Sequence, residues 1–284
     1  MTQPSEKQAN RRAEEEARLE QAFLKGEKDP ELGVYRSIFS AKCSSEGQDG
    51  GVVTALLVNG LEGGLLDAAV VVGHGQGYSV RAVAATSTSE VTAARGTKYL
   101  RVQVTPKLRE IIKQGAKRVA VVCTPCEVAA ARKIQQAVVG ECELTVIGLF
   151  CFEAFNADKL KHEVEVRLGV DLNRAEKTQI RRGEFTAQVE GTEFSCRVKD
   201  LEEAADRACR YCDDFTSRLA DVSVGSVGSK RGYSTVIVRS EAGEKLVKAL
   251  DCAKESVDRE EIAKLSKFKV KRAKESFAAL NRRQ

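Results

Sequence analysis

Apolar stretches of strand length alternate with amphipathic stretches of helix length from residue 34 to residue 168. The stretches at 66–73, 118–123 and 144–151 have the length and composition of buried strands, and helical patterns lie between and after them. This alternation predicts an α/β fold of mixed α+β character, in which helices flank a layered sheet and some strands pair in parallel. Such sheets bind their ligands beyond the carboxyl ends of the strands. The segments that follow those ends are therefore the expected place for a functional site.

The 284 residues are expected to form one main domain with a charged extension at each end. The domain spans 34–255, and short alternating stretches predict a small antiparallel insertion within it at about 175–200. Residues 1–33 form a charged N-terminal extension. Its polar helix, 11–23, has too thin an apolar stripe to be stable alone, so it is expected to fray or to dock on another subunit. Residues 256–284 form a basic helical tail.

The charge of the chain gives little support to a nucleic-acid partner. The formal net charge is +5, and residues 264–284 hold eight basic residues against one acid. A solvated or partner-docking helix is the favoured interpretation, because a nucleic-acid site spreads its charge along a groove and carries stacking aromatics. No apolar run reaches the length of a membrane span, and the charged N-terminus lacks the apolar stretch of a signal peptide. The cytoplasm is the expected location.

The nine cysteines are expected to be reduced thiols, some of them metal ligands, because disulfides are rare in the cytoplasm. Two residues separate Cys209 from Cys212, a spacing that lets both sulfurs face one metal ion or one iron–sulfur cluster. A cluster needs four thiolates. The candidates for the remaining two are the pair Cys123 and Cys126, and Cys151.

Cys126 is the stronger candidate of its pair. It follows Pro125 at a predicted helix start, where the helix dipole favours a thiolate. Cys123 ends an alternating strand, where cysteine serves as a small hydrophobic residue. The resulting set of ligands has four sulfurs and no histidine: Cys126, Cys151, Cys209 and Cys212. The other cysteines lack partners at ligand spacing and are expected to be structural: Cys43, Cys142, Cys196 and Cys252.

Two glycine-containing segments are candidates for binding an anion. In residues 47–57 a glycine pair opens a predicted helix, whose free N–H groups and positive dipole end suit a phosphate. An ordinary turn with an aspartate N-cap is the more frequent reason for such a pattern. Residues 95–99 place two cations and a hydroxyl beside a glycine. That arrangement suits an anion cradle and a solvated turn equally.

Several motifs occur together in the order found in one known family. They are Gln48-Asp49-Gly50-Gly51-Val52-Val53-Thr54, Gly96-Thr97-Lys98-Tyr99, Thr124-Pro125-Cys126, Cys151-Phe152-Glu153, Cys209-x-x-Cys212-x-Asp214-Phe215 and the stretch from Ala220 to Gly228. Over about residues 35–252 the chain resembles the beta subunit of coenzyme F420-reducing hydrogenases and dehydrogenases. It departs from that family at Glu127, where glutamine is common, and the extension before Val34 has no counterpart there.

The resemblance implies a subunit that binds FAD and one 4Fe-4S cluster and exchanges a hydride with coenzyme F420. No catalytic residue beyond the flavin is implied. The matched segments that would hold FAD are Gln48, Asp49, Gly50, Gly51 and Thr54, then Gly96, Thr97, Lys98 and Tyr99, with Ser226 and Gly228 helping to shape the surroundings. The ligands of the cluster would be Cys126, Cys151, Cys209 and Cys212. Arg95 and Arg101 flank the second segment and are candidates for binding the anionic tail of F420.

The electrons would pass singly from the cluster to another redox subunit, of hydrogenase, formate dehydrogenase or heterodisulfide reductase type. One alternative is a reductase of the same fold that acts on another substrate. Another is a structural zinc protein with a basic nucleic-acid-binding tail, since zinc binds the same thiolates. Hydrolysis is disfavoured, because the chain has only two histidines and shows no Ser-His-Asp or metal-hydrolase spacing.

Overall fold

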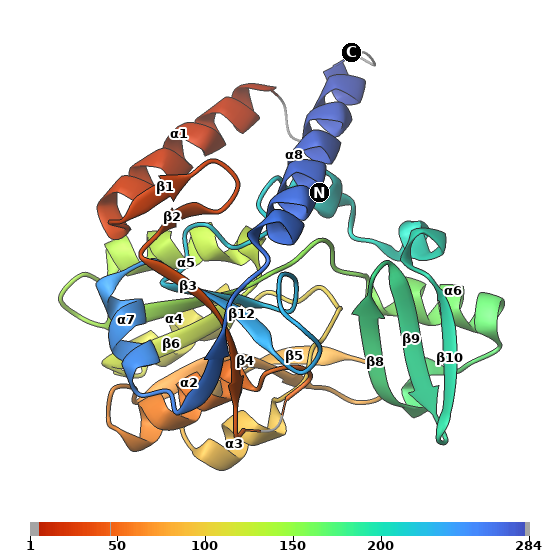
Figure 1. The fold of residues 1–284 in the computed structure, drawn as a ribbon, viewed down its shortest axis with the longest axis horizontal. Coiled ribbons are helices and arrows are strands. Elements are labelled where there is room, and N and C mark those ends of the chain that lie inside the picture. Colours follow the sequence, from red (N-terminus) through yellow and green to blue (C-terminus); the bar gives the residue numbers. More distant parts are fainter. Residues whose placement is uncertain (1–5, 46, 282–284) are drawn as a thin grey trace.

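An eight-stranded mixed sheet forms the centre of the protein (Figure 1). The computed structural model describes residues 6–45 and 47–281. From one edge of the sheet to the other, the strands are β13 (Cys252–Glu255), β3 (Ser37–Cys43), β12 (Ser234–Val238), β11 (Val222–Gly225), β7 (Glu143–Leu149), β6 (Arg118–Cys123), β4 (Ala68–His74) and β5 (Val80–Ala85).

Five of these strands run in the same direction. Parallel pairing joins β4 to β6, β6 to β7 and β7 to β11. The strand β3 shares their direction because β12 pairs antiparallel with both β11 and β3. The carboxyl ends of these five strands therefore all lie at the same end of the sheet, which we call its carboxyl edge. The predicted layered sheet with partly parallel pairing is confirmed.

Helices cover both faces of the sheet, because successive side chains of a strand point to opposite sides. In β4, Ala69 and Val71 join one apolar core, whereas Ala68 and Val70 join the other. The first core is covered by α2 (Val52–Glu62), α3 (Thr88–Ala93) and α7 (Glu241–Lys248), and the second by α1 (Glu6–Phe23), α4 (Thr105–Lys113) and α5 (Pro125–Ala137). None of the described helices is both long and apolar enough to cross a membrane.

A smaller sheet stands beside the main one (Figure 1). Its antiparallel strands confirm the predicted insertion, and they are β8 (Ala175–Arg181), β9 (Glu184–Val189) and β10 (Thr192–Arg197). The helix α6 (Ala157–Leu168) contributes Leu160 and Val164 to the apolar core of this region. The short 3-10 helix η1 (Leu172–Arg174) precedes β8. Two further 3-10 helices, η2 (Val198–Ala204) and η3 (Arg207–Tyr211), follow β10.

The N-terminal helix corrects a prediction. It was expected to fray or to dock on another subunit, but α1 packs on α5 of its own chain. Leu19 is only 2% exposed within the second core. The guanidinium of Arg132 lies 4.8 Å from the centre of the Phe23 ring, and Lys133 forms a 2.7 Å ion pair with Glu15. Burying a leucine side chain contributes about 1.5–3 kcal/mol, which is enough to hold a thin apolar stripe in place. The hairpin of β1 (Glu27–Asp29) and β2 (Gly33–Tyr35) follows α1.

A second correction concerns two cysteines that were expected to be reduced. Cys43 and Cys252 form a disulfide, and the other seven cysteines are free. The two residues face each other in the register of β3 and β13, and their Cα atoms are 4.2 Å apart. Since 209 positions separate them in the sequence, their local spacing gives no sign of the pairing. The disulfide fixes the edge strand β13 to the end of β3.

A buried arginine joins three parts of the chain. Arg239 is fully buried directly after β12, and burial lowers its pKa to about 10, so it remains charged at neutral pH. Its guanidinium donates 2.7 Å hydrogen bonds to the carbonyls of Leu32 and Val34, and a 2.8 Å bond to the hydroxyl of Ser223 in β11. It also donates to Thr216, in the loop that follows Cys212. One side chain thus holds the β1–β2 hairpin, β11 and the cysteine loop together.

We predict that Arg239→Met lowers the free energy of unfolding by about 3 kcal/mol or more, because several buried acceptors lose their donor. Urea denaturation measures the change. The matched control is Arg36→Met, which removes an exposed 2.8 Å ion pair with Glu244. Exposed pairs contribute about 1 kcal/mol at most, so a small effect is expected there. Equal losses in both variants would show that Arg239 does not have this central role.

Candidate functional site

The segments that follow the carboxyl ends of the main-sheet strands include several of those selected from the sequence. Residues 44–45 and 47–51 follow β3, and residues 124–126, at the start of α5, follow β6. The loops of residues 150–155 and 226–233 follow β7 and β11. Open α/β sheets bind their ligands at this edge. The third and fourth predicted cysteines reach the same region from η3, which lies outside the sheet.

Hydrogen bonds fix the loop of residues 209–215 against the loop that carries Cys151. The Cys151 N–H donates to the carbonyl of Phe215 over 3.0 Å. The Ala154 N–H donates to the sulfur of Cys209 over 3.4 Å. Three of the four predicted ligands therefore lie in two loops that are bonded to each other.

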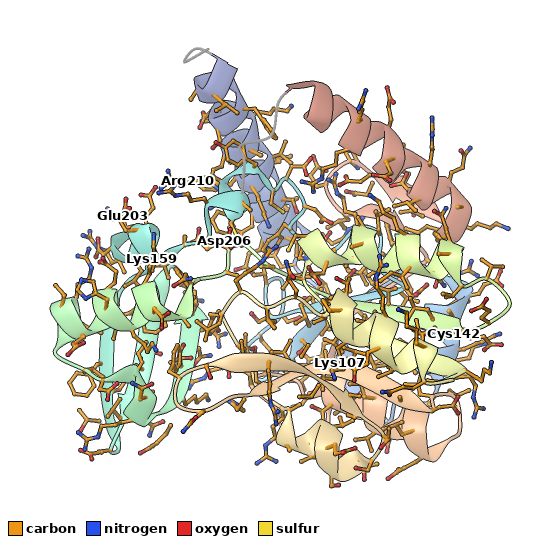
Figure 2. All side chains as sticks on the ribbon, turned by 180° about the vertical axis from the view of Figure 1, so that it is seen from behind. Lys107, Cys142, Lys159, Glu203, Asp206 and Arg210 are labelled. Carbon is orange, nitrogen blue, oxygen red and sulfur yellow. A yellow bond between two sulfur atoms is a disulfide. The ribbon has the colours of Figure 1, made fainter. Side chains whose placement is uncertain are left out.

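Cys126 approaches these loops from the segment that follows the neighbouring strand β6. It lies in the first turn of α5, and its exposed sulfur accepts a 3.0 Å hydrogen bond from Nη1 of Arg101. The Arg101 guanidinium also lies 4.0 Å from the carboxylate of Asp206. Asp206 belongs to the segment that runs from the small sheet towards α8 (Arg259–Asn281), as Figure 2 shows.

The four thiols are close enough to affect one another electrostatically. Burial raises the pKa of Cys151 to about 12, and Cys209, Cys126 and Cys212 add to the increase. Burial also raises the pKa of Cys209 to about 11, with a further contribution from Cys126. Such thiols ionise readily only when a nearby cation compensates their charge, as iron or zinc does.

The remaining free cysteines lie in packed surroundings. Cys123 is 3% exposed and packs in the second core, and burial raises its pKa well above the ordinary value. Cys142 belongs to the same core, and Figure 2 shows it well away from Asp206. Cys196 is partly buried and packs against the core of the small sheet. These surroundings suit small hydrophobic residues.

No three His, Cys, Asp or Glu side chains in the described ranges converge on a point where they could hold a metal ion. A four-iron cluster needs less convergence, because each thiolate binds a different iron. The donor set of four sulfurs from neighbouring loops therefore fits a 4Fe-4S cluster better than a single zinc ion.

The basic C-terminal helix covers these loops and does not stand free in solvent. The ammonium group of Lys269 donates to the carbonyl of Cys151. Arg272 donates to the carbonyls of Phe152 and Cys209 over 2.9 and 3.0 Å and pairs with Glu153 at 2.9 Å. The cations of α8 thus bind the main chain of both cysteine loops.

The glycine pair at the start of α2 has a structural reason. A Cβ atom at Gly50 would lie 2.2 Å from the carbonyl oxygen of Ala41, and one at Gly51 would lie 1.9 Å from that of Ser45. Gly51 also has a φ of 67°, which favours glycine. Close packing of the main chain therefore requires both glycines, whether or not a phosphate binds beside them. Thr54 lies half-buried one turn into α2.

The residues before the glycine pair face the small sheet. Gln48 donates a 3.1 Å hydrogen bond to the carbonyl of Thr178 in β8, and the Tyr99 hydroxyl accepts one of 2.9 Å from the Ile180 N–H of the same strand. Burial raises the pKa of Tyr99 to about 12, with smaller effects that include the charge of Asp49. Two of the segments expected to hold FAD, 48–54 and 96–99, therefore meet at β8.

A further group of cations lies beyond the end of β4. Lys98 donates to the carbonyls of Ala94 and Arg95, and burial lowers its pKa to about 8. The charge of Lys98 contributes to lowering the pKa of His74, after the effect of burial. A cavity of about 650 Å³ is lined by His74, Thr88, Ser89, Thr92, Ala93 and Arg95. Gly96 and Thr97 are exposed between these residues and Tyr99.

The 226–229 loop lies against the start of α8. The Gly228 N–H donates to Glu261 over 3.0 Å, and the Gly228 carbonyl accepts from the Asp258 N–H over 2.8 Å. Ser226 is exposed, whereas Gly228 is buried. These contacts place the loop beside α8, and none of them joins it to the segments at β8.

Two residues that hold this region together were not selected from the sequence. Glu127 is buried and accepts hydrogen bonds from the N–H groups of Val104 and Thr105, at the start of α4. Lys269 occupies a core position of α8. The buried residues of that helix follow a helical period, and they are Ile262, Ser266, Lys269, Ala273 and Leu280. A lysine within such a stripe is a signal that sequence reasoning could have used.

Two models of one known protein family match this chain. Residues 38–109 match the N-terminal model of the coenzyme F420 hydrogenase/dehydrogenase beta subunit, and residues 116–264 match the model of its C terminus. Together the two models cover most of the chain.

Two of the similar proteins are named for coenzyme F420. The chain is 38% identical to a coenzyme F420-dependent sulfite reductase of Methanocaldococcus jannaschii over 84% of its own length, but it spans only 40% of that protein. It is 32% identical to the coenzyme F420 hydrogenase subunit beta of Methanothermobacter thermautotrophicus, over 76% of this chain and 82% of the relative.

A solved structure shows the same fold. One chain of the F420-reducing [NiFe] hydrogenase complex from Methanosarcina barkeri superposes with a TM-score of 0.82 at 30% identity, covering 88% of this chain and 94% of that one. The chain belongs to the coenzyme F420 hydrogenase/dehydrogenase beta subunit family.

Proposed function

We propose that this chain binds FAD and one 4Fe-4S cluster, exchanges a hydride with coenzyme F420 and passes single electrons to a partner redox subunit. The observation that carries the proposal is the group of four thiols at the carboxyl edge of the sheet, covered by the cations of α8. The family membership and the names of the relatives support the role of F420.

The cluster would be held by Cys126, Cys151, Cys209 and Cys212. The hydrogen bonds between the 150–155 and 209–215 loops would fix the spacing of three of these ligands. The Arg101 guanidinium would orient the fourth through its bond to Cys126. The cations offset the negative charge of thiolate ligands, which favours binding of iron.

FAD would lie between the carboxyl edge of the main sheet and β8, held by the segments 48–54 and 96–99. When bound, FAD can take up two electrons together and release them one at a time, which links a hydride donor to a one-electron cluster. Asp49 and Tyr99 would face the cofactor from the side of the small sheet, next to β8. Lys98 would offer a positive charge to the phosphates of FAD.

The anionic tail of F420 would enter by the cavity beside Arg95 and His74. A cationic entrance raises the capture rate of a polyanion. Arg101 remains a second candidate for the tail, although its guanidinium already binds Cys126 and Asp206. Measurements of iron content and of KM separate the two possible roles of Arg101.

The partner is proposed by chemical class only, as a redox subunit that accepts or supplies single electrons. Relatives named as hydrogenase subunits support such a partner. The chain corresponds to 40% of the sulfite reductase relative, so reduction of sulfite is not proposed for it.

The cluster assignment is tested by serine variants. Replacing Cys126, Cys151, Cys209 or Cys212 removes a thiolate ligand, and each variant is expected to keep less than about a third of the wild-type iron. Cys123→Ser is the control, and we expect it to keep its iron because Cys123 packs in the apolar core. Iron and sulfide are assayed on protein purified without oxygen. Iron loss in Cys123→Ser with retention in Cys126→Ser would overturn the assignment, and zinc with no flavin in the wild type would support the zinc alternative.

The flavin assignment is tested at Lys98, because substitutions of Gly50 or Gly51 would disturb main-chain packing. We expect Lys98→Met to weaken FAD binding about tenfold, since a charge-assisted hydrogen bond contributes about 1.5–3 kcal/mol. Titration of FAD into flavin-free protein, followed by flavin fluorescence, measures the affinity. The control is Lys113→Met, on the exposed side of α4. Equal affinities in the two variants would place the phosphates of FAD elsewhere.

The F420 entrance is tested at Arg95. We expect Arg95→Ala to raise the KM for F420 about fivefold at low salt with unchanged FAD content, because long-range attraction of the polyanion is reduced. The effect should shrink as salt rises, since exposed charges are screened over about 8 Å at physiological ionic strength. The assay follows reduction of a one-electron dye by reduced F420. Arg109→Ala, an exposed change on α4, is the control. A KM that does not change in Arg95→Ala would contradict the proposed entrance.

A further inference from the structure

Lys269 carries its charge into the interior of the protein. Its side chain lies at a core position of α8 and the residue is 1% exposed. The ammonium group donates to the carbonyl of Cys151, and Cys212, Cys151 and Asp214 are the acidic groups around it. Burying an ammonium group without a compensating negative charge is strongly unfavourable. The site must therefore supply that negative charge.

The neighbouring carboxylate is already engaged by other groups. Asp214 is 6% exposed and accepts hydrogen bonds from the N–H groups of Thr216 and Arg218, at 3.1 and 2.9 Å. It also lies 3.7 Å from the Arg218 guanidinium. Since Arg218 already offsets its charge, Asp214 is a shared partner for Lys269. The sulfurs of Cys151 and Cys212 are the other acidic groups beside the ammonium group, and as ligands of iron they would carry negative charge.

The neighbouring lysines of α8 are exposed to solvent, unlike Lys269. Lys267 and Lys271, two positions away on either side, have side chains 67% and 74% exposed and pair with the surface residues Glu31 and Glu275. The helix therefore turns one lysine inward and leaves its neighbours outside. Lys269 also lies beyond residues 116–264, the part of the chain that matches the family's C-terminal model.

We propose that Lys269 is a positioning residue for the 4Fe-4S cluster, and that its buried charge makes one-electron reduction of the cluster more favourable. Reduction adds one negative charge to the cluster, and a fixed cation nearby stabilises the reduced form more than the oxidised form. The electron comes from reduced F420 by way of the flavin, so this inference rests on the proposed function. No bond is formed or broken at Lys269.

The test compares Lys269→Met with Lys271→Met, a matched change on the exposed side of the same helix. Each protein is held at the potential at which half of the wild-type cluster is reduced, and the reduced fraction is measured by electron paramagnetic resonance. We expect the ratio of reduced to oxidised cluster to fall about tenfold in Lys269→Met, which is 59 mV for a one-electron couple. The ratio should stay within about twofold of wild type in Lys271→Met, because solvent and salt screen an exposed charge.

Lys269→Arg keeps the positive charge, so it separates an effect of the charge from an effect of altered packing or folding. If Lys269→Met loses iron, retention in Lys269→Arg supports the role of the charge, whereas loss in both variants indicates a packing role and overturns the inference. An unchanged ratio in an iron-containing Lys269→Met protein also overturns it, with the proposed function left standing. A wild-type protein that binds no iron overturns the proposed function and this inference together.

Discussion

The buried guanidinium of Arg239 is the interaction on which the arrangement of the site depends. A charged group that is fully buried must have every N–H donor matched, because an unmatched donor costs about 1–3 kcal/mol. Arg239 meets this demand with acceptors from the β1–β2 hairpin, from Ser223 and from Thr216. A second buried charge, Arg132 of α5, is compensated by an ion pair and not by a full set of hydrogen bonds. It lies 3.0 Å from Asp221, whose carboxylate accepts from the Val146 N–H of β7. Polar groups inside the fold thus fix the positions of loops that the apolar cores alone would leave free.

Much of the fold follows from patterns that can be seen in the sequence, and the exceptions have physical causes. Long apolar strands such as β4 and β6 are predicted because their burial on both faces leaves a continuous apolar run. In contrast, β11 lies within residues 221–229, whose glycine and serine content does not indicate a strand. It is a buried strand in which Val222 and Val224 enter the first core while Ser223 accepts a hydrogen bond from Arg239. A serine with a buried partner looks the same in a sequence as a serine in solvent. The docking of α1 and the Cys43–Cys252 pairing depend on contacts between distant segments, so local patterns could not predict them.

Residues of the candidate site could be selected from the sequence where a short local pattern indicates metal binding. The spacing of Cys209 and Cys212 and the helix start at Cys126 are local features, and the structure brings these residues near Cys151. The glycines of residues 50–51 were weaker signals, because close packing of main chain on main chain requires glycine as readily as a ligand does. The basic C-terminal segment was the least predictable part. Its excess charge suggested solvent exposure, yet Lys269 and Arg272 are turned towards the cysteine loops.

The position of α8 in the chain has a consequence for how the protein is made. Each of the four proposed ligands precedes α8 in the sequence, and a chain folds progressively as it leaves the ribosome. The sheet and its loops can therefore form while the helix that covers them is still being synthesised. During that interval the side of the cysteine loops that α8 later covers would be open to a donor of iron and sulfide. Docking of α8 then covers these loops, so the proposed cluster would be loaded before α8 closes over it.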